Sequence, residues 1–117
     1  AFSLRQNLEV AEAAGAEVKV LRAMGGSANS LLWTQIKADV TGKKVVVPAS
    51  DTATTLGAAI LAGVGVGVYK DYEEAVSLTV RETRNHEPNP LNKETYDKTY
   101  RTYRELYESL KHMMVRQ

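Results

Sequence analysis

Two adjacent glycines, Gly25 and Gly26, lie where a β-prone segment gives way to a helical pattern, and they constrain the chain more than any other feature. The segment Glu17 to Met24 is rich in β-branched residues and predicts a strand, and the apolar spacing from Ala28 to about Val40 predicts a helix. Because glycine has no Cβ, the backbone here can approach a ligand closely. The N-terminus of the following helix favours an anion or a polar ligand edge. The same pattern also occurs in strand-to-helix connections that bind nothing.

The composition excludes several classes of protein. The 117 residues carry 15 Lys plus Arg against 14 Asp plus Glu, a net charge of +1, so we expect one region and no nucleic-acid partner. There is no cysteine, which excludes disulfides and thiolate metal sites and suits the cytoplasm. The longest apolar stretch, Leu56 to Val68, is too short for a bilayer, so no membrane partner is expected. The chain begins at Ala1 inside a helical pattern, and we expect either a cut within a longer polypeptide or the removal of a start methionine.

The first half of the chain predicts alternating helices and strands. Gly15 and Gly42 are placed to end helices in a left-handed conformation. Val45 to Val47, closed by Pro48, predicts a strand buried on both faces of a parallel sheet. The predicted elements up to this point are a helix at 3–14, a strand at 17–24, a helix at 28–40 whose apolar face is Leu32, Trp33, Ile36 and Val40 with Trp33 in the core, and a strand at 45–47.

The second half predicts three more helices and a loop. A helix of small residues runs from Leu56 to Ala62, and close backbone approach would explain Gly57 within it. The glycines Gly63, Gly65 and Gly67 follow this helix instead of preceding one, so they predict a turn and not a phosphate loop. The remaining elements are a helix at 71–80 capped by Asp71, an exposed loop at 81–92, and a long helix from 93.

The long helix carries an aromatic stripe that predicts packing against the body of the domain or against another chain, so a homo-oligomer is one alternative. The stripe consists of Tyr96, Tyr100, Tyr103, Tyr107, Leu110 and Met114. Pairs of opposite charge four residues apart predict a solvated face and not a site, namely Glu94 with Lys98, Asp97 with Arg101, and Arg104 with Glu108.

No constellation of catalytic residues is recognisable in this sequence. His86 lies in the proline-containing loop and His112 on an exposed helix end, and neither has the spacing of a metal ligand. Asp39 and Asp51 each have a plain structural role, as a helix-face and a cap residue. We therefore predict no catalytic residue and no metal ligand in this chain.

The order of several motifs resembles the carboxy-terminal part of the FGGY carbohydrate kinases, and within that family the xylulokinase branch. The resemblance covers nearly the whole chain, including the spaced tyrosines after Pro88. The motifs are Met24-Gly-Gly-Ser-Ala-Asn-Ser30, Trp33-Thr-Gln35-Ile36, Ala38-Asp39-Val40, Thr41-Gly42, Val47-Pro48, Leu56-Gly-Ala-Ala-Ile-Leu-Ala62 and Val64-Gly65.

The resemblance implies a helix-rich α/β fold, part of an actin-like ATPase (ribonuclease H-like) domain, with two predicted strands and about five helices. Residues 1–117 would form the carboxy-terminal half of the second, nucleotide-side domain of a larger sugar kinase. It also implies contacts with the adenosine part of ATP: backbone approach at Gly25 and Gly26, polar neighbours at Ser27 and Asn29, and the adenine edge at Ser30.

The full enzyme would transfer the γ-phosphoryl group of ATP to a hydroxyl of a pentulose such as xylulose or a similar polyol. The sugar site, the catalytic aspartate and the ligands of Mg²⁺ would all lie outside this chain, so the fragment alone should be inactive. One departure from the family is that Thr52 to Thr55 stand where an acidic residue is usual, with Asp51 as the nearest substitute.

Two other functions remain open from the sequence. One is a non-catalytic, helix-rich module that self-associates through its tyrosine-striped helix. The other is an actin-like domain that binds a nucleotide without sugar chemistry.

Overall fold

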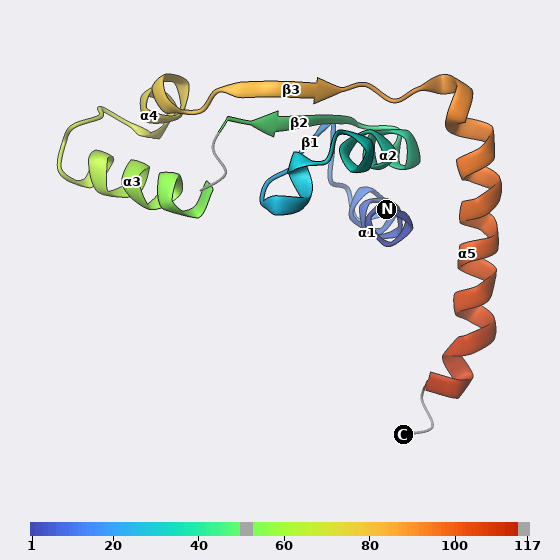
Figure 1. Ribbon diagram of the computed structural model, residues 1–117. Helices are drawn as coiled ribbons and strands as arrows, with labels where there is room; N and C mark the ends of the chain where they lie inside the picture. Colours follow the sequence, from blue (N-terminus) through green and yellow to red (C-terminus); the bar gives the residue numbers. More distant parts are fainter. Residues whose placement is uncertain (50–52, 115–117) are drawn as a thin grey trace.

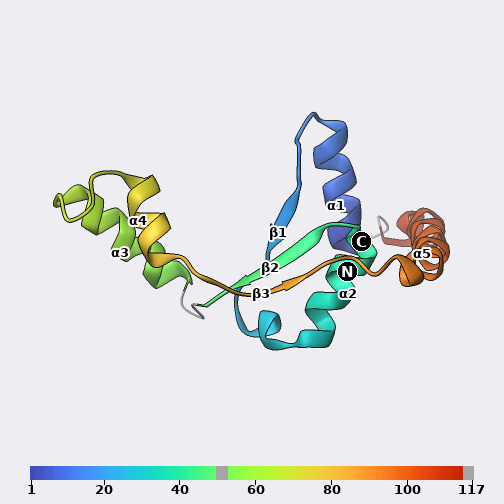
Figure 2. The same cartoon turned by 90° about the horizontal axis from the view of Figure 1, so that it is seen from above.

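The computed structural model describes residues 1–49 and 53–114, and in that part of the chain five α-helices and three strands form an elongated molecule of 55 × 39 × 28 Å (Figure 1). A short sheet lies in the middle, with the α3–α4 pair at one end and α5 at the other (Figures 1 and 2). The elements are α1 (Phe2–Ala13), β1 (Val20–Arg22), the 3-10 helix η1 (Gly26–Asn29), α2 (Leu31–Thr41), β2 (Lys44–Pro48), α3 (Ala53–Gly65), α4 (Tyr72–Thr79), β3 (Glu82–His86), the 3-10 helix η2 (Pro90–Asn92) and α5 (Lys93–Met114). None of the described helices combines the length and apolar character needed to cross a membrane.

The sheet has the order β1-β2-β3, with β1 parallel and β3 antiparallel to β2. Val45, Val46 and Val47 of β2 are at most 5% exposed, which confirms the predicted burial on both faces. The prediction of a parallel sheet is wrong for β3, which pairs antiparallel with β2. The prediction of a loop at 81–92 is wrong for β3. Its residues, Glu-Thr-Arg-Asn-His, lack the apolar alternation of a half-buried strand. Strand β3 lies at the edge of the sheet, and none of its side chains is fully buried.

Helix α2 covers the sheet with small side chains instead of large ones. Thr34 and Ala38 are fully buried, and the helix packs on β2 and β3. The predicted apolar face is therefore partly wrong: Val40 is buried, but Leu32 is 71% and Trp33 37% exposed. The prediction that Gly42 ends the helix is confirmed, because it caps α2 with φ +66°.

The α3–α4 pair extends beyond the sheet. Helix α3 continues to Gly65, so the prediction that it ends before Gly63 is wrong. Within the described residues nothing lies within 4 Å of a Cβ placed on Gly57, whereas a Cβ on Gly63 would meet the Tyr69 ring at 2.7 Å. Close approach in this part of the chain thus occurs at Gly63 and not at Gly57. Asp71 caps α4 as predicted, accepting from the Glu74 N–H at 2.8 Å, while Asp51 lies outside the described residues.

The aromatic stripe of α5 packs on the body over its first half, as predicted. The Phe2 ring of α1 lies 5.7 Å from the ring of Tyr100, which is 4% exposed. Further along, Tyr107 is 50% exposed. The interpretation of Asp97 as part of a solvated face is wrong, because its carboxylate pairs with Arg5 of α1 at 2.7 Å.

Candidate functional site

The glycine turn, which we define as residues 24–30, follows the end of β1 and consists mostly of the 3-10 helix η1. Gly25 has φ +81°, a left-handed conformation that disfavours any residue with a side chain. The carbonyl of Gly25 accepts from the Ala28 N–H at 2.9 Å, which closes the turn. Ala28 is 2% exposed and anchors the turn to the body. It belongs to η1, so the prediction that it begins the helix at 28–40 is wrong.

Ser30 is the N-cap of α2, and its hydroxyl accepts from the Trp33 N–H at 3.2 Å. This satisfies one of the backbone donors that a helix leaves open at its N-terminus. A structural role therefore accompanies the predicted ligand contact of Ser30.

The other residues predicted to contact a ligand are brought together on the surface of the turn. Gly25, Gly26, Ser27 and Asn29 are all exposed. Among the described residues, no heavy atom lies within 4 Å of a Cβ placed on either glycine. The space above the turn is therefore open to a ligand.

An apolar hollow of about 290 Å³ adjoins the glycine turn through Met24. Its size is at the lower end of the range of about 300–1,000 Å³ for ligand pockets. The hollow also contains Pro48, so it lies at the edge where the parallel strands β1 and β2 end, the edge where open α/β sheets bind ligands. Its lining residues are Arg22, Met24, Pro48, Ala53, Leu56, Gly57, Ile60, Val76 and Val80. This hollow could not be predicted from the sequence, because α3 and α4 contribute most of its walls.

The turn itself carries no cationic side chain. The nearest cation in sequence, Arg22, pairs with Glu82 of β3 at 3.2 Å. An apolar hollow beside exposed backbone and small polar side chains suits a planar heterocycle better than a phosphate group.

Two further residues of strand β3, which was not predicted, also contact this region. Arg84 donates from Nη2 to the Ala28 carbonyl at 2.6 Å. His86, expected in a loop, lies 3.0 Å from the hydroxyl of Thr34 and 3.0 Å from Oε1 of Gln35. Neither contact could be read from the sequence, because 56 residues separate Arg84 from Ala28.

Asp39 lies toward the other end of α2 and is 7% exposed. Burial raises the pKa of its carboxyl, but the Asn89 N–H and the amides of Asn92 and Gln35 outweigh burial and hold the pKa below its ordinary value. These three donors lie 2.7–2.8 Å from its oxygens. The carboxylate thus joins α2 to residues 89–92, which lead into α5, and has a structural role there.

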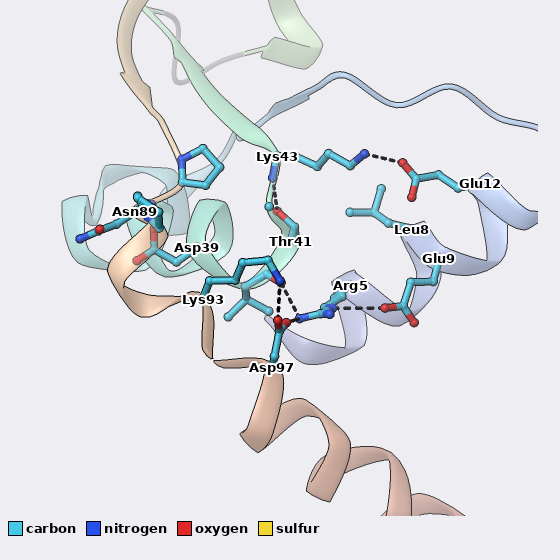
Figure 3. Close-up of a pocket in the computed structure, with 14 residues that line it drawn as sticks. Arg5, Leu8, Glu9, Glu12, Asp39, Thr41, Lys43, Asn89, Lys93 and Asp97 are labelled. Carbon is cyan, nitrogen blue, oxygen red and sulfur yellow. Dashed lines mark hydrogen bonds and ion pairs between the residues drawn. The ribbon is translucent and has the colours of Figure 1, made fainter. Parts of the chain in front are cut away.

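A second hollow, of about 430 Å³, lies at the end of α2 that is remote from the glycine turn (Figure 3). Its three cations are all held in ion pairs: Arg5 and Lys93 pair with Asp97, and Lys43 pairs with Glu12 at 2.5 Å. Lys93 and Arg5 hold the pKa of Asp97 below its ordinary value. These ion pairs join α1 to α5 and to the end of α2, so the cations of the hollow already have carboxylate partners. Among the described residues no group of three or more His, Cys, Asp or Glu could hold a metal ion.

Comparison with known proteins gives a consistent result. Residues 1–66 match the FGGY family of carbohydrate kinases, C-terminal domain. The chain is 41% identical over 100 residues to the autoinducer-2 kinase of Salmonella paratyphi B and 39% identical over 99 residues to that of Yersinia enterocolitica, covering 86% and 85% of this chain and 19% of each relative. It thus spans about a fifth of the length of these relatives.

Among solved structures, the chain is similar to the xylulose kinase of Rhodospirillum rubrum. The TM-score is 0.83 at 29% identity, over 98% of this chain and 23% of that one. This likeness confirms the expected helix-rich α/β, actin-like ATPase fold.

Proposed function

Because the chain belongs to the FGGY family of carbohydrate kinases, we propose that it forms the adenosine side of the ATP site in such a kinase. The residues that would contact adenosine are Gly25, Gly26, Ser27, Asn29 and Ser30. In this proposal residues 1–117 are the carboxy-terminal half of the nucleotide-side domain of a longer cytoplasmic enzyme. The partners are ATP and a sugar substrate.

The observation that carries the proposal is that the glycine turn and the apolar hollow adjoin at the carboxyl edge of β1 and β2. An adenine ring needs apolar contact for its faces and polar groups for its edges. Met24 and the walls of the hollow offer the first. The backbone at Gly25 and Gly26, with the exposed side chains of Ser27 and Asn29, offers the second.

The phosphates require a different set of groups. Phosphoryl transfer depends on cations and Mg²⁺ that neutralise the transferred group. The glycine turn has no cation, and the described residues include no metal-ligand cluster. We therefore place the phosphate contacts and the Mg²⁺ ligands, together with the sugar site and the catalytic base, outside this chain. The chain alone should be inactive.

For the acceptor we propose a pentulose such as xylulose or a similar polyol, as the similarity to the R. rubrum xylulose kinase suggests. A second candidate is autoinducer-2, which is favoured by the higher identity, 41%, to the Salmonella paratyphi B enzyme. A screen of both substrates on the full-length protein separates the two.

The test of the nucleotide role is Gly26→Val in the full-length protein. Gly26 is outside the positive-φ region and a Cβ there meets nothing within 4 Å, so the substitution should leave the fold intact while filling the space above the turn. We expect KM for ATP to rise about tenfold or more, equivalent to about 1.4 kcal/mol of lost binding. The KM for the sugar should change little.

A matched control is Gly65→Val at the end of α3, where a Cβ also meets nothing within 4 Å. This variant should keep the wild-type KM for ATP. An unchanged KM for ATP in Gly26→Val would contradict the proposal.

A further inference from the structure

Three side chains of strand β3 contact the segment that contains the glycine turn. Arg84 and His86 share one face of the sheet, whereas the irregularity of register between Val47 and Pro48 places Glu82 on the other face. Glu82 pairs with Arg22, next to the turn, at 3.2 Å. Arg84 contacts the turn itself, and His86 contacts the first turns of α2. One edge strand therefore holds the segments before, within and after the glycine turn.

The contact of Arg84 is the most direct of the three. Its Nη2 donates at 2.6 Å to the carbonyl of Ala28, whose own N–H donates to the Gly25 carbonyl at 2.9 Å. The guanidinium is thus linked to Gly25 through a single residue. A donor that carries a full charge forms a shorter and stronger bond than a neutral one. Because Ala28 is 2% exposed, water cannot readily replace the guanidinium at this carbonyl.

His86 fixes the other side of the turn through Thr34. The amide nitrogen of Gln35 donates to Asp39 and to the Glu87 carbonyl, so its Oε1 accepts, and Nδ1 of His86 carries the proton shared with it. The Nε2 atom of His86 is then an acceptor and lies 3.0 Å from the hydroxyl of Thr34. These contacts join the first turns of α2 to β3.

We propose that Arg84 is a positioning residue for the nucleotide site, holding the glycine turn through the Ala28 carbonyl in the conformation that receives adenosine. This rests on the proposed function of the turn. Arg84 is bonded to the Ala28 carbonyl and does not line the apolar hollow, so in this proposal it acts through the turn and not by touching the nucleotide. Its loss should therefore weaken binding of ATP without changing the binding of the sugar.

The experiment compares three variants of the full-length protein: Arg84→Met, Arg84→Lys and Arg81→Met. Methionine keeps an unbranched side chain like the aliphatic stem of arginine but removes the guanidinium donors. Lysine retains a charge but not the planar fork of donors, so it should restore binding only in part. Arg81, exposed just before β3, is the matched control.

We expect Arg84→Met to raise KM for ATP about tenfold, the size expected for one charge-assisted bond to a buried carbonyl. KM for the sugar should stay within about twofold, and the melting temperature should fall by no more than a few degrees. Arg84→Lys should lie between this variant and wild type. Arg81→Met should match wild type. A rise in both KM values together with a large loss of thermal stability would mean a general structural role and would overturn the proposal.

Gly26→Val, measured alongside, separates this inference from the function on which it rests. If Gly26→Val raises KM for ATP and Arg84→Met does not, the positioning role is wrong and the site stands. If neither variant changes KM for ATP, the site itself is wrong and the inference fails with it. If both variants act through the turn, KM for ATP in the double variant should rise by less than the product of the two single rises, because both variants disturb one structure. A rise equal to that product would mean independent effects and would overturn the inference.

Discussion

Asp39 holds the junction between α2 and α5 at the level of a single residue. One carboxylate oxygen accepts from Gln35 and from the Asn89 N–H, and the other accepts from Asn92. Since the side chain is 7% exposed, water cannot readily replace these donors. Residues 89–92, between β3 and α5, are therefore held to α2 largely by one carboxylate.

We predict that Asp39→Asn destabilises the protein by about 2–3 kcal/mol at neutral pH, because an amide group would face donors with a donor of its own. Urea unfolding measures this. The matched control is Asp71→Asn, because asparagine caps a helix about as well as aspartate, and it should be nearly neutral. A loss of unfolding free energy in Asp39→Asn no larger than the loss in the control would contradict the prediction.

Asp39 also makes the stability of the folded protein depend on pH. The folded protein holds the pKa of Asp39 below its unfolded value of about 3.9, so ionised Asp39 stabilises the fold. This contribution is complete above about pH 4 and is lost as the pH falls through the lower, folded value. The stability difference between wild type and Asp39→Asn should therefore narrow in acid.

Several residues could be predicted from sequence because their roles are local. Gly42 and Asp71 act through the backbone of their own helix ends, and these predictions are confirmed. Apart from Gln35, the partners of Asp39, Arg84 and His86 lie 50 or more residues away in sequence. No local pattern records such contacts, so sequence reasoning missed the second half of the candidate site.

Two of the three glycines of helix α3, Gly57 and Gly63, have different surroundings. Alanine at a helix interior is more favourable than glycine by about 1 kcal/mol. Gly57→Ala meets nothing within 4 Å among the described residues, whereas Gly63→Ala meets the Tyr69 ring at 2.7 Å. Hydrogen exchange of the α3 amides in the full-length protein should slow in Gly57→Ala and accelerate in Gly63→Ala. Faster exchange in Gly57→Ala would show that another part of the protein approaches α3 at Gly57.

Elements with a strong pattern were predictable, and elements defined by tertiary contacts were not. The valine run of β2 and the tyrosine spacing of α5 predicted their elements because apolar burial repeats along them. Strand β3 has no apolar residue and forms because its backbone pairs with β2. The burial of α2 through Thr34 and Ala38, instead of Leu32 and Trp33, likewise depends on how closely the helix approaches the sheet.

At the scale of the whole molecule, the chain is less compact than an independent domain. Its radius of gyration is 18.2 Å, against about 13 Å for a compact domain of this length. Large apolar side chains remain exposed at both ends, including Val66 and Val68 near α3 and Leu106 and Tyr107 on α5. This supports the proposal that the chain is one part of a larger kinase domain.

The central claim, that the glycine turn receives adenosine, is tested most directly by a crystal structure of the full-length protein with a non-hydrolysable ATP analogue and Mg²⁺. We predict that the adenine ring lies in contact with the backbone of Gly25 and Gly26, with one face toward the hollow that contains Met24. The phosphates should point away from this chain, toward cationic groups elsewhere in the protein. An analogue bound with its adenine at another site, and the glycine turn facing solvent, would contradict the account.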